Sequence, residues 1–213
     1  MLVLLVAAGV YYLVVELERD IVPLSQKASK RLERLWEVAK LGMKEKKYLR
    51  AEKALLTILK LDQKNASAYN RLGILYSRQK EYKDAIECFE IASSIEPTAS
   101  SLHNLGLIYY ETENYPKAAL AFEAALKIED DLAARYIAYA KVQEKLEEHE
   151  LVVESILKAV KLEPNPQTYK LLADAYKRAG LDNEAKKIQQ KLDHLILPAG
   201  KKEHVKRSKR VVY

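Results

Sequence analysis

The fold of this chain is decided by residues 66–97, which read ASAYNRLGILYSRQKEYKDAIECFEIASSIEP. Apolar residues recur there in two stretches, at the i, i+3, i+4 and i+7 intervals that place them on one face of a helix. A polar turn, RQKEY, separates the two stretches, and Pro97 follows the second. This segment therefore predicts two amphipathic helices joined by a short turn.

The same pattern returns in residues 99–130, after 33 residues. The shared positions hold a Leu-Gly pair, a tyrosine, an alanine, a phenylalanine and a second alanine. They are Leu72, Gly73, Tyr76, Ala85, Phe89 and Ala92 in the first copy, and Leu105, Gly106, Tyr109, Ala118, Phe122 and Ala125 in the second. This spacing resembles the tetratricopeptide repeat (TPR). The resemblance implies an array of antiparallel helix pairs that binds other proteins and carries no chemistry of its own.

The two strong copies allow weaker ones to be aligned. Five repeats then begin at residues 32, 66, 99, 133 and 166. We therefore expect an all-α fold, a right-handed TPR-like solenoid of about five helix pairs over residues 32–197. Small residues are expected where the helices of a pair cross, so a bulky side chain at Ala85 or Ala118 would cost roughly 1–3 kcal/mol. Gly42 and Val152 depart from the repeat pattern.

Tyrosines follow the same register. Ten of the fourteen fall at repeat positions 4, 7, 11 or 17. Tyrosines in a basic chain could stack on the bases of a nucleic acid. Because the register accounts for them, we interpret them as packing residues instead.

The N-terminus has a different composition. Residues 1–15 read MLVLLVAAGVYYLVV without a charge, and Leu17 extends the apolar run past Glu16. Fifteen helical residues span about 22 Å, short of the roughly 30 Å hydrocarbon core. We expect residues 1–17 to be a transmembrane helix and residues 18–31 a helical linker. One alternative is a cleaved signal peptide, whose charged start and small-residue cleavage site are missing here. Another is a buried cap of the solenoid, which the adjacent Tyr11 and Tyr12 fit poorly.

Basic residues lie on one side of this apolar run. None precedes it, whereas Arg19, Lys27, Lys30, Arg31 and Arg34 follow it. The positive-inside rule then predicts a single-pass protein with its repeats in the cytoplasm. The opposite topology would give an extracytoplasmic scaffold for envelope assembly or secretion. The order of anchor and repeats is also similar to bacterial envelope-assembly factors of the lipopolysaccharide type. Those carry a cysteine-based metal domain that this sequence lacks, so their specific function is not implied.

Residues 198–213, PAGKKEHVKRSKRVVY, leave the repeat pattern and predict a disordered basic tail. Its basic residues outweigh Glu203 by +5, within a net charge of +6 for the chain. They are Lys201, Lys202, Lys206, Arg207, Lys209 and Arg210. Contact with anionic lipid, contact with nucleic acid and a merely solubilising role are all open interpretations. Nucleic-acid association through this tail, with the repeats as a dimerising module, is the alternative function from another class.

The resemblance also implies a binding surface. In this family the first helix of each repeat lines the concave side, mostly through positions 2, 5, 9, 12 and 13. The candidate partner-binding residues are Trp36, Lys40, Asn70, Ile74, Arg78, His103, Leu107, Tyr110, Ile137, Lys141 and Lys170. Asn104 matches the asparagine with which some relatives clamp a terminal carboxylate, but the full basic set around it is missing. An apolar middle and basic ends predict a partner peptide or helix with apolar anchors and acidic flanks.

The sequence contains no motif for chemistry. The four histidines lack metal-ligand spacing, and HExxH, CxxC, GxSxG and glycine-rich phosphate loops are absent. Cys88 is the single cysteine and reads as a partly buried small residue. We expect a protein-binding scaffold that is not an enzyme and has no cofactor.

Overall fold

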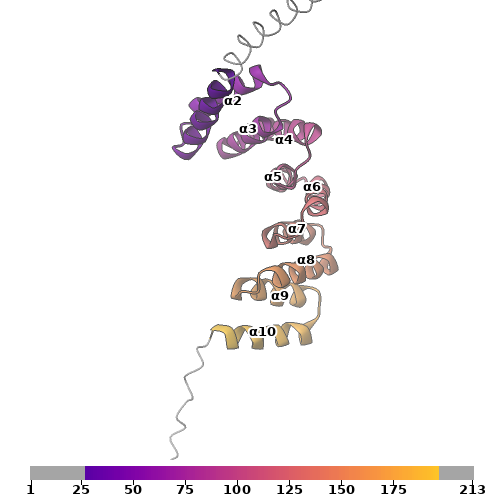
Figure 1. The fold of residues 1–213 in the computed structure, drawn as a ribbon. Coiled ribbons are helices and arrows are strands. Elements are labelled where there is room, and N and C mark those ends of the chain that lie inside the picture. Colours follow the sequence, from indigo (N-terminus) through magenta and orange to yellow (C-terminus); the bar gives the residue numbers. More distant parts are fainter. Residues whose placement is uncertain (1–26, 197–213) are drawn as a thin grey trace, which may run out of the picture. The chain divides into compact units, whose positions relative to one another are not determined.

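The computed structural model describes residues 27–196, which form ten helices and no strand. The first occupies residues 27–44. Figure 1 labels the others, which are α2 (Tyr48–Leu61), α3 (Ala66–Gln79), α4 (Tyr82–Ile95), α5 (Ala99–Glu111), α6 (Tyr115–Ile128), α7 (Ala133–Lys145), α8 (His149–Leu162), α9 (Pro166–Arg178) and α10 (Asp182–Ile196). The all-α prediction is confirmed for this part of the chain. The predicted anchor and basic tail lie outside the described residues.

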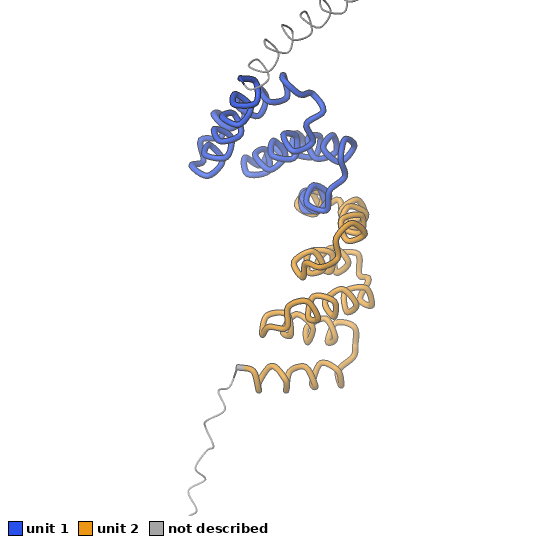
Figure 2. The backbone as a smooth tube through the Cα atoms, viewed as in Figure 1, with its two compact units in different colours: residues 1–108 blue, residues 109–213 orange. Residues whose placement is uncertain are grey.

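The helices divide into two compact units, with the boundary between Ile108 and Tyr109 inside α5 (Figure 2). Among the described residues, unit 1 contains residues 27–44, α2, α3, α4 and α5 as far as Ile108. Unit 2 contains the last turn of α5 and helices α6 to α10. Contacts are most extensive within the helix pairs α3–α4, α7–α8 and α9–α10. The helix pair is therefore the packing element of both units.

Four first helices begin where the repeats were predicted to begin. These helices are α3, α5, α7 and α9, which start at Ala66, Ala99, Ala133 and Pro166. Asn65 caps α3, since its side chain accepts a hydrogen bond from the backbone N–H of Ala68 at 2.9 Å. Asn114 caps α6 in the same way, with the backbone N–H of Lys117 at 3.4 Å. The first repeat differs, because its helix already includes residue 27. The boundary expected between residues 31 and 32 lies inside that helix.

The turn inside each helix pair has one geometry. A residue in the left-handed region ends the first helix of all five pairs, namely Lys46, Lys80, Glu113, Glu147 and Gly180, with φ between 58° and 73°. The next residue donates its N–H to a carbonyl five residues earlier, as Glu81 does to Tyr76 at 2.9 Å. This arrangement is the Schellman motif of helix C-termini. The turns therefore repeat with the 33–34-residue register, although only the fifth uses glycine.

Small residues allow the helices of a pair to cross closely. A Cβ atom added at Gly73 would lie 2.7–2.8 Å from the ring of Phe89, so α3 and α4 touch there. Gly42 lies similarly close to the next helix, since an added Cβ would be 3.0 Å from the Ala51 Cβ. Ala85 and Ala118 are fully buried, as the repeat pattern predicts. Close packing against Ala51 therefore explains why the first repeat has a glycine at residue 42.

Two repeat tyrosines join neighbouring repeats. The Tyr76 hydroxyl donates to a Glu52 carboxylate oxygen at 2.9 Å, and the Tyr139 hydroxyl donates to Glu123 at 2.6 Å. Burial, reinforced by these carboxylates, raises the pKa of both phenols above the usual value. Both side chains therefore pack and hydrogen-bond between helices, which supports the packing interpretation of the tyrosines.

Replacing Gly73 by alanine tests the close crossing. Because Phe89 is buried, the ring cannot move aside freely, and we expect the free energy of unfolding to fall by about 1–3 kcal/mol. Urea unfolding followed by circular dichroism measures this change. The same substitution in a Phe89→Leu background is the control, and there the added methyl group should cost clearly less. Equal costs in both backgrounds would show that the ring does not set the crossing distance.

Candidate partner-binding surface

Four residues of α3 form one exposed or half-buried face. Ser67, Asn70, Arg71 and Ile74 follow the i, i+3, i+4, i+7 spacing of a helix face. Together with Trp36 of the first helix, Asn65, and Ser100 of α5, they line a pocket of about 740 Å³ in unit 1. The structure therefore brings the candidate residues Trp36, Asn70 and Ile74 into one place.

The contacts in this pocket and beside it combine an aromatic surface with amides. The Arg71 guanidinium lies over the Trp36 ring, 5.2 Å from its centroid, which is cation–π geometry. The Asn104 amide donates to the Asn70 side-chain oxygen across 3.4 Å, a long hydrogen bond. Each of these amides can also bond a second group, such as the backbone of an extended peptide.

Two candidate cations have partners within unit 1. Arg78 donates to the Met43 carbonyl oxygen at 3.2 Å, so it joins α3 to the end of the first helix. Lys40 lies 3.6 Å from Glu37, and both side chains are well exposed. A surface pair of this kind contributes little to stability, so Lys40 remains accessible to a ligand. Arg78 thus has a structural contact that its position in the repeat does not reveal.

The helix α5 carries four further candidates. His103 and Asn104 are half-buried, and Leu107 is 39% exposed. Tyr110 belongs to unit 2, where its ring lies 5.7 Å from that of Tyr115. Leu107 is therefore the more exposed apolar candidate of this helix.

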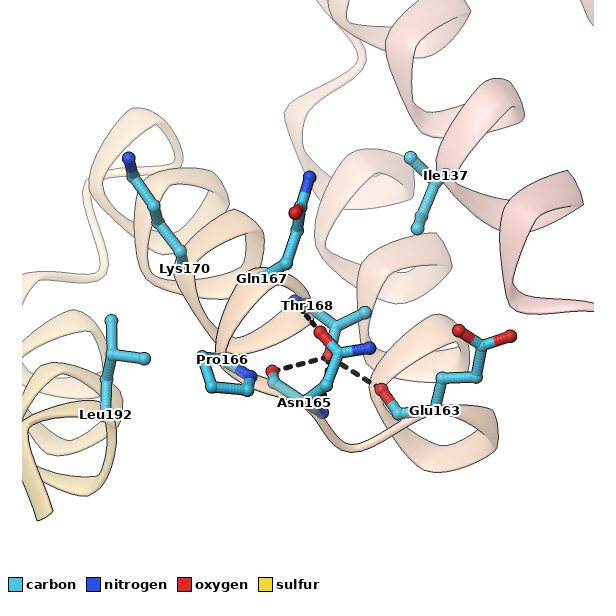
Figure 3. Close-up of a pocket in the computed structure, with 8 residues that line it drawn as sticks. All are labelled: Ile137, Glu163, Asn165, Pro166, Gln167, Thr168, Lys170 and Leu192. Atoms are coloured by element: carbon cyan, nitrogen blue, oxygen red, sulfur yellow. Dashed lines mark hydrogen bonds between the residues drawn. The ribbon is translucent and has the colours of Figure 1, made fainter. Parts of the chain in front are cut away.

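A second pocket, of about 720 Å³, lies in unit 2 around the start of α9 (Figure 3). Asn165 and Thr168 form a capping box there, with bonds of 3.0 and 3.1 Å between each side chain and the other residue's backbone N–H. Ile137 of α7 and Leu192 of α10 provide apolar surface, and Lys170 provides a positive charge. Two further candidates, Ile137 and Lys170, thus line one pocket.

The remaining charges of unit 2 are partly used within the protein. Glu144 and Arg178, both at groove positions of the repeat, form an ion pair with one another. Lys141 is exposed on α7. The basic character expected at the C-terminal end is therefore reduced by pairing, and Lys141 and Lys170 are its exposed candidates.

The sequence pattern did not single out Asn65 or Arg71. Asn65 precedes α3 and belongs to the turn, although an asparagine just before a helix is a recognisable cap. Arg71 lies four residues after Ser67 and so shares its side of the helix. That spacing is the signal that could have found it.

A further hollow, of about 590 Å³, lies on the second-helix side of unit 1, between α2 and α4. Cys88 lines it, and burial raises the pKa of its thiol to about 12, with smaller contributions from Glu87 and Asp84. A thiol with such a pKa is protonated near neutral pH and is a poor nucleophile.

Other expectations concern metals and the chain ends. Within residues 27–196, no three His, Cys, Asp or Glu side chains come together as a metal site. No helix in that range is both long and apolar enough to cross a membrane. Lys201, Lys202, Lys206, Arg207, Lys209 and Arg210 lie outside the described residues, as do residues 1–17.

Comparison with known families identifies the repeat. Residues 64–131 match the family model described as tetratricopeptide repeat. No curated protein matches the chain. The matched stretch covers the second and third helix pairs, where the sequence pattern is strongest.

Solved structures extend the likeness of the fold to most of the chain. MamA is 21% identical with a TM-score of 0.70, over 78% of this chain and 92% of that one. YrrB, described as a TPR protein with an unusual peptide-binding site, is 17% identical with a TM-score of 0.65, over 74% of this chain and 82% of that one. A chain of the Naa15/Naa10 complex bound to HypK-THB is 24% identical with a TM-score of 0.65, over 80% of this chain and 26% of that one. The fold is therefore that of a TPR-like solenoid.

The raised pKa values of the Cys88 thiol and the Tyr139 phenol predict that the free energy of unfolding falls at high pH. A raised pKa in the folded state means that the unfolded chain loses its proton first, so folding is favoured less as pH rises. For Cys88 this begins near the ordinary thiol pKa of about 8.5, and it should reach about 1–2 kcal/mol by pH 10. Urea unfolding between pH 7 and pH 11 measures the effect.

Two variants separate the contributions to this pH dependence. Cys88→Ala should flatten the curve between pH 8.5 and 10, whereas Tyr139→Phe should flatten it only above about pH 10, the ordinary phenol pKa. An unchanged slope between pH 8.5 and 10 in Cys88→Ala would contradict the assignment to the thiol.

Proposed function

We propose that this chain, whose residues 64–131 match the tetratricopeptide repeat, is a protein-binding scaffold held at a membrane. Its first helices bind a peptide or helical segment of a partner protein. The observation that carries the proposal is the pocket where Trp36, Asn70 and Ile74 meet. The peptide-binding site described for YrrB, which shares the fold, supports the same use of the repeats.

The pocket chemistry indicates the kind of partner. Trp36 and Ile74 offer apolar surface to a partner side chain, and the amides of Asn70 and Asn104 offer hydrogen bonds to its backbone. Arg71 and the accessible Lys40 favour a carboxylate nearby. An extended or helical segment with an apolar anchor and acidic flanks satisfies all three features.

The unit 2 pocket has a similar combination of chemistry. Ile137 and Leu192 supply the apolar part, and Lys170 supplies the positive charge. A partner with more than one apolar anchor would thus find a second matching surface in the same chain. We infer that Leu107, Tyr110 and Lys141 take part in the same recognition.

Membrane attachment is assigned to residues 1–17. The uncharged apolar run of residues 1–15 supports this, and the basic residues that follow support a cytoplasmic location of the repeats. The scaffold would then concentrate its partner at the bilayer, with the basic tail near anionic lipid. The proposal includes no catalysis and no cofactor.

Trp36 is the single tryptophan of the chain, so its fluorescence reports on the proposed pocket directly. Peptides selected from a phage-displayed library on the full-length protein should be rich in apolar and acidic residues. Titrating one of them should change the Trp36 emission. Ile74→Glu should weaken its binding at least about tenfold, because it removes the apolar contact and repels the acidic flanks.

The matched control is Leu120→Glu, a change of the same kind at a residue of α6 that is 65% exposed and outside both pockets. Circular dichroism must show that both variants are folded. The assignment of peptide binding to the unit 1 pocket is wrong if the two variants bind the peptide equally well.

Deleting residues 1–17 tests the membrane proposal. Without the apolar segment, the protein should move from the membrane fraction to the soluble fraction of lysed cells, because the remaining charges alone bind bilayers reversibly. Immunoblotting of the two fractions measures the distribution, and a carbonate wash removes peripheral proteins. A full-length protein that is already soluble would refute the anchor without affecting peptide binding.

A further inference from the structure

The first helix pair is the most basic part of the described chain. Residues 27–64 contain twelve Lys or Arg and five Asp or Glu, a net charge of +7, whereas the whole chain carries +6. The rest of the chain is therefore slightly acidic on balance, in spite of its basic tail. A concentration of charge this local points to an anionic ligand for this helix pair.

The basic residues share one side of the pair with apolar residues. On the first helix, Arg31 and Arg34 precede Leu35 and Val38 by four residues, so each pair lies along the same side. Leu35 and Val38 also line a hollow of about 390 Å³ between this helix and α2. The α2 residues in its lining are Leu49, Arg50, Lys53, Ala54 and Thr57. We call the surface formed by Arg31, Arg34, Leu35, Val38, Leu49, Arg50 and Lys53 the basic end face.

Three carboxylates of the first helix pair and its turn have other partners. Glu37 lies near Lys40, Glu45 pairs with Lys47 at 2.8 Å and interacts more weakly with Arg50, and Glu52 accepts a hydrogen bond from the Tyr76 hydroxyl of α3. Glu33 lies one turn before Glu37 and shares its side of the helix. None of the residues that line the hollow is acidic.

The repeat register shows what is unusual about this face. Adding 34 to residues 35, 38, 50, 53, 54 and 57 gives Tyr69, Leu72, Asp84, Glu87, Cys88 and Ile91, which all line the corresponding hollow of the second pair. There, α2 adds a wall with Leu56, Leu59 and Lys60, so a cation of α2 shares the hollow with Asp84 and Glu87. In the first pair, Arg50 and Lys53 replace these two carboxylates, and the lining includes no residue of a preceding helix among those described.

We propose that the basic end face binds the anionic surface of a lipid bilayer. Arginine and lysine side chains contact lipid phosphates and carboxylates, and Leu49, 63% exposed, reaches into the interface. A second copy of the same face is a poor occupant, because its charges would repel. The inference rests on the membrane location of the proposed function. Contact between the basic end face and lipid would hold the first helix pair against the same bilayer.

Vesicle binding of the full-length protein tests this proposal. Neutral phosphatidylcholine vesicles report on residues 1–17 alone, whereas vesicles with 30 mol% phosphatidylserine add the contribution of basic surfaces. The variant Arg34→Glu, Arg50→Glu, Lys53→Glu should lose roughly a hundredfold of the phosphatidylserine-dependent affinity, because each basic residue near the surface contributes about fivefold. Its affinity for neutral vesicles should not change.

The control reverses the charge of three exposed lysines on other helices, with the substitutions Lys158→Glu, Lys161→Glu and Lys186→Glu. Its net charge therefore falls by the same amount as that of the first variant. It should lose less than about threefold, and thermal unfolding must show both variants folded. Equal losses in both, or no loss in the first, would overturn the proposal. A first variant that keeps its lipid affinity but no longer binds an acidic peptide would overturn it in favour of a protein ligand. If the wild type binds neutral vesicles weakly but phosphatidylserine vesicles well, the anchor is refuted and the lipid binding of the basic end face still stands.

Discussion

The close approach of α3 to the Phe89 ring is the constraint on which the first unit depends. A Cβ atom at Gly73 would overlap that ring, so the two helices are in contact along their small residues. Ala68, Leu72 and Leu75 of the same helix are buried as well. Ser67, Asn70, Arg71 and Ile74 are exposed or half-buried and line a pocket. The packing of α3 within its unit therefore leaves these four side chains to meet a partner.

The turns impose the same order on every helix pair. Each first helix ends at a residue with positive φ, and the chain then reverses into the second helix through the same backbone hydrogen bonds. Four of these five residues are Lys or Glu, for which a left-handed conformation is unfavourable, and only Gly180 adopts it without cost. Packing of the helix pair must outweigh that cost in the other four. The fold is thus specified by the helix contacts more than by the turn residues.

Much of the helix layout could be predicted from sequence, because the repeat fixes where small and large residues fall. The starts of α3, α5, α7 and α9 coincide with the predicted repeat starts, and the Asn114 cap was recognisable from its place before Pro116. The site was harder to predict. The bond from Arg78 to Met43 and the ion pair of Glu144 with Arg178 depend on side chains 35 and 34 residues apart, which helix periodicity does not place. The reason for a glycine at residue 42 likewise follows only from its contact with Ala51, which the sequence pattern does not give.

The geometry of the first helix bears on whether partner binding and lipid contact can coexist. Trp36, which lines the unit 1 pocket, lies two residues from both Arg34 and Val38. Residues two apart on a helix point in nearly opposite directions, since each residue turns the helix by about 100°. A peptide beside Trp36 would therefore not cover Arg34, and a bilayer against Arg34 would not block the pocket. One short helix can in this way present a recognition surface and an attachment surface at once, and occupation of either leaves the other accessible.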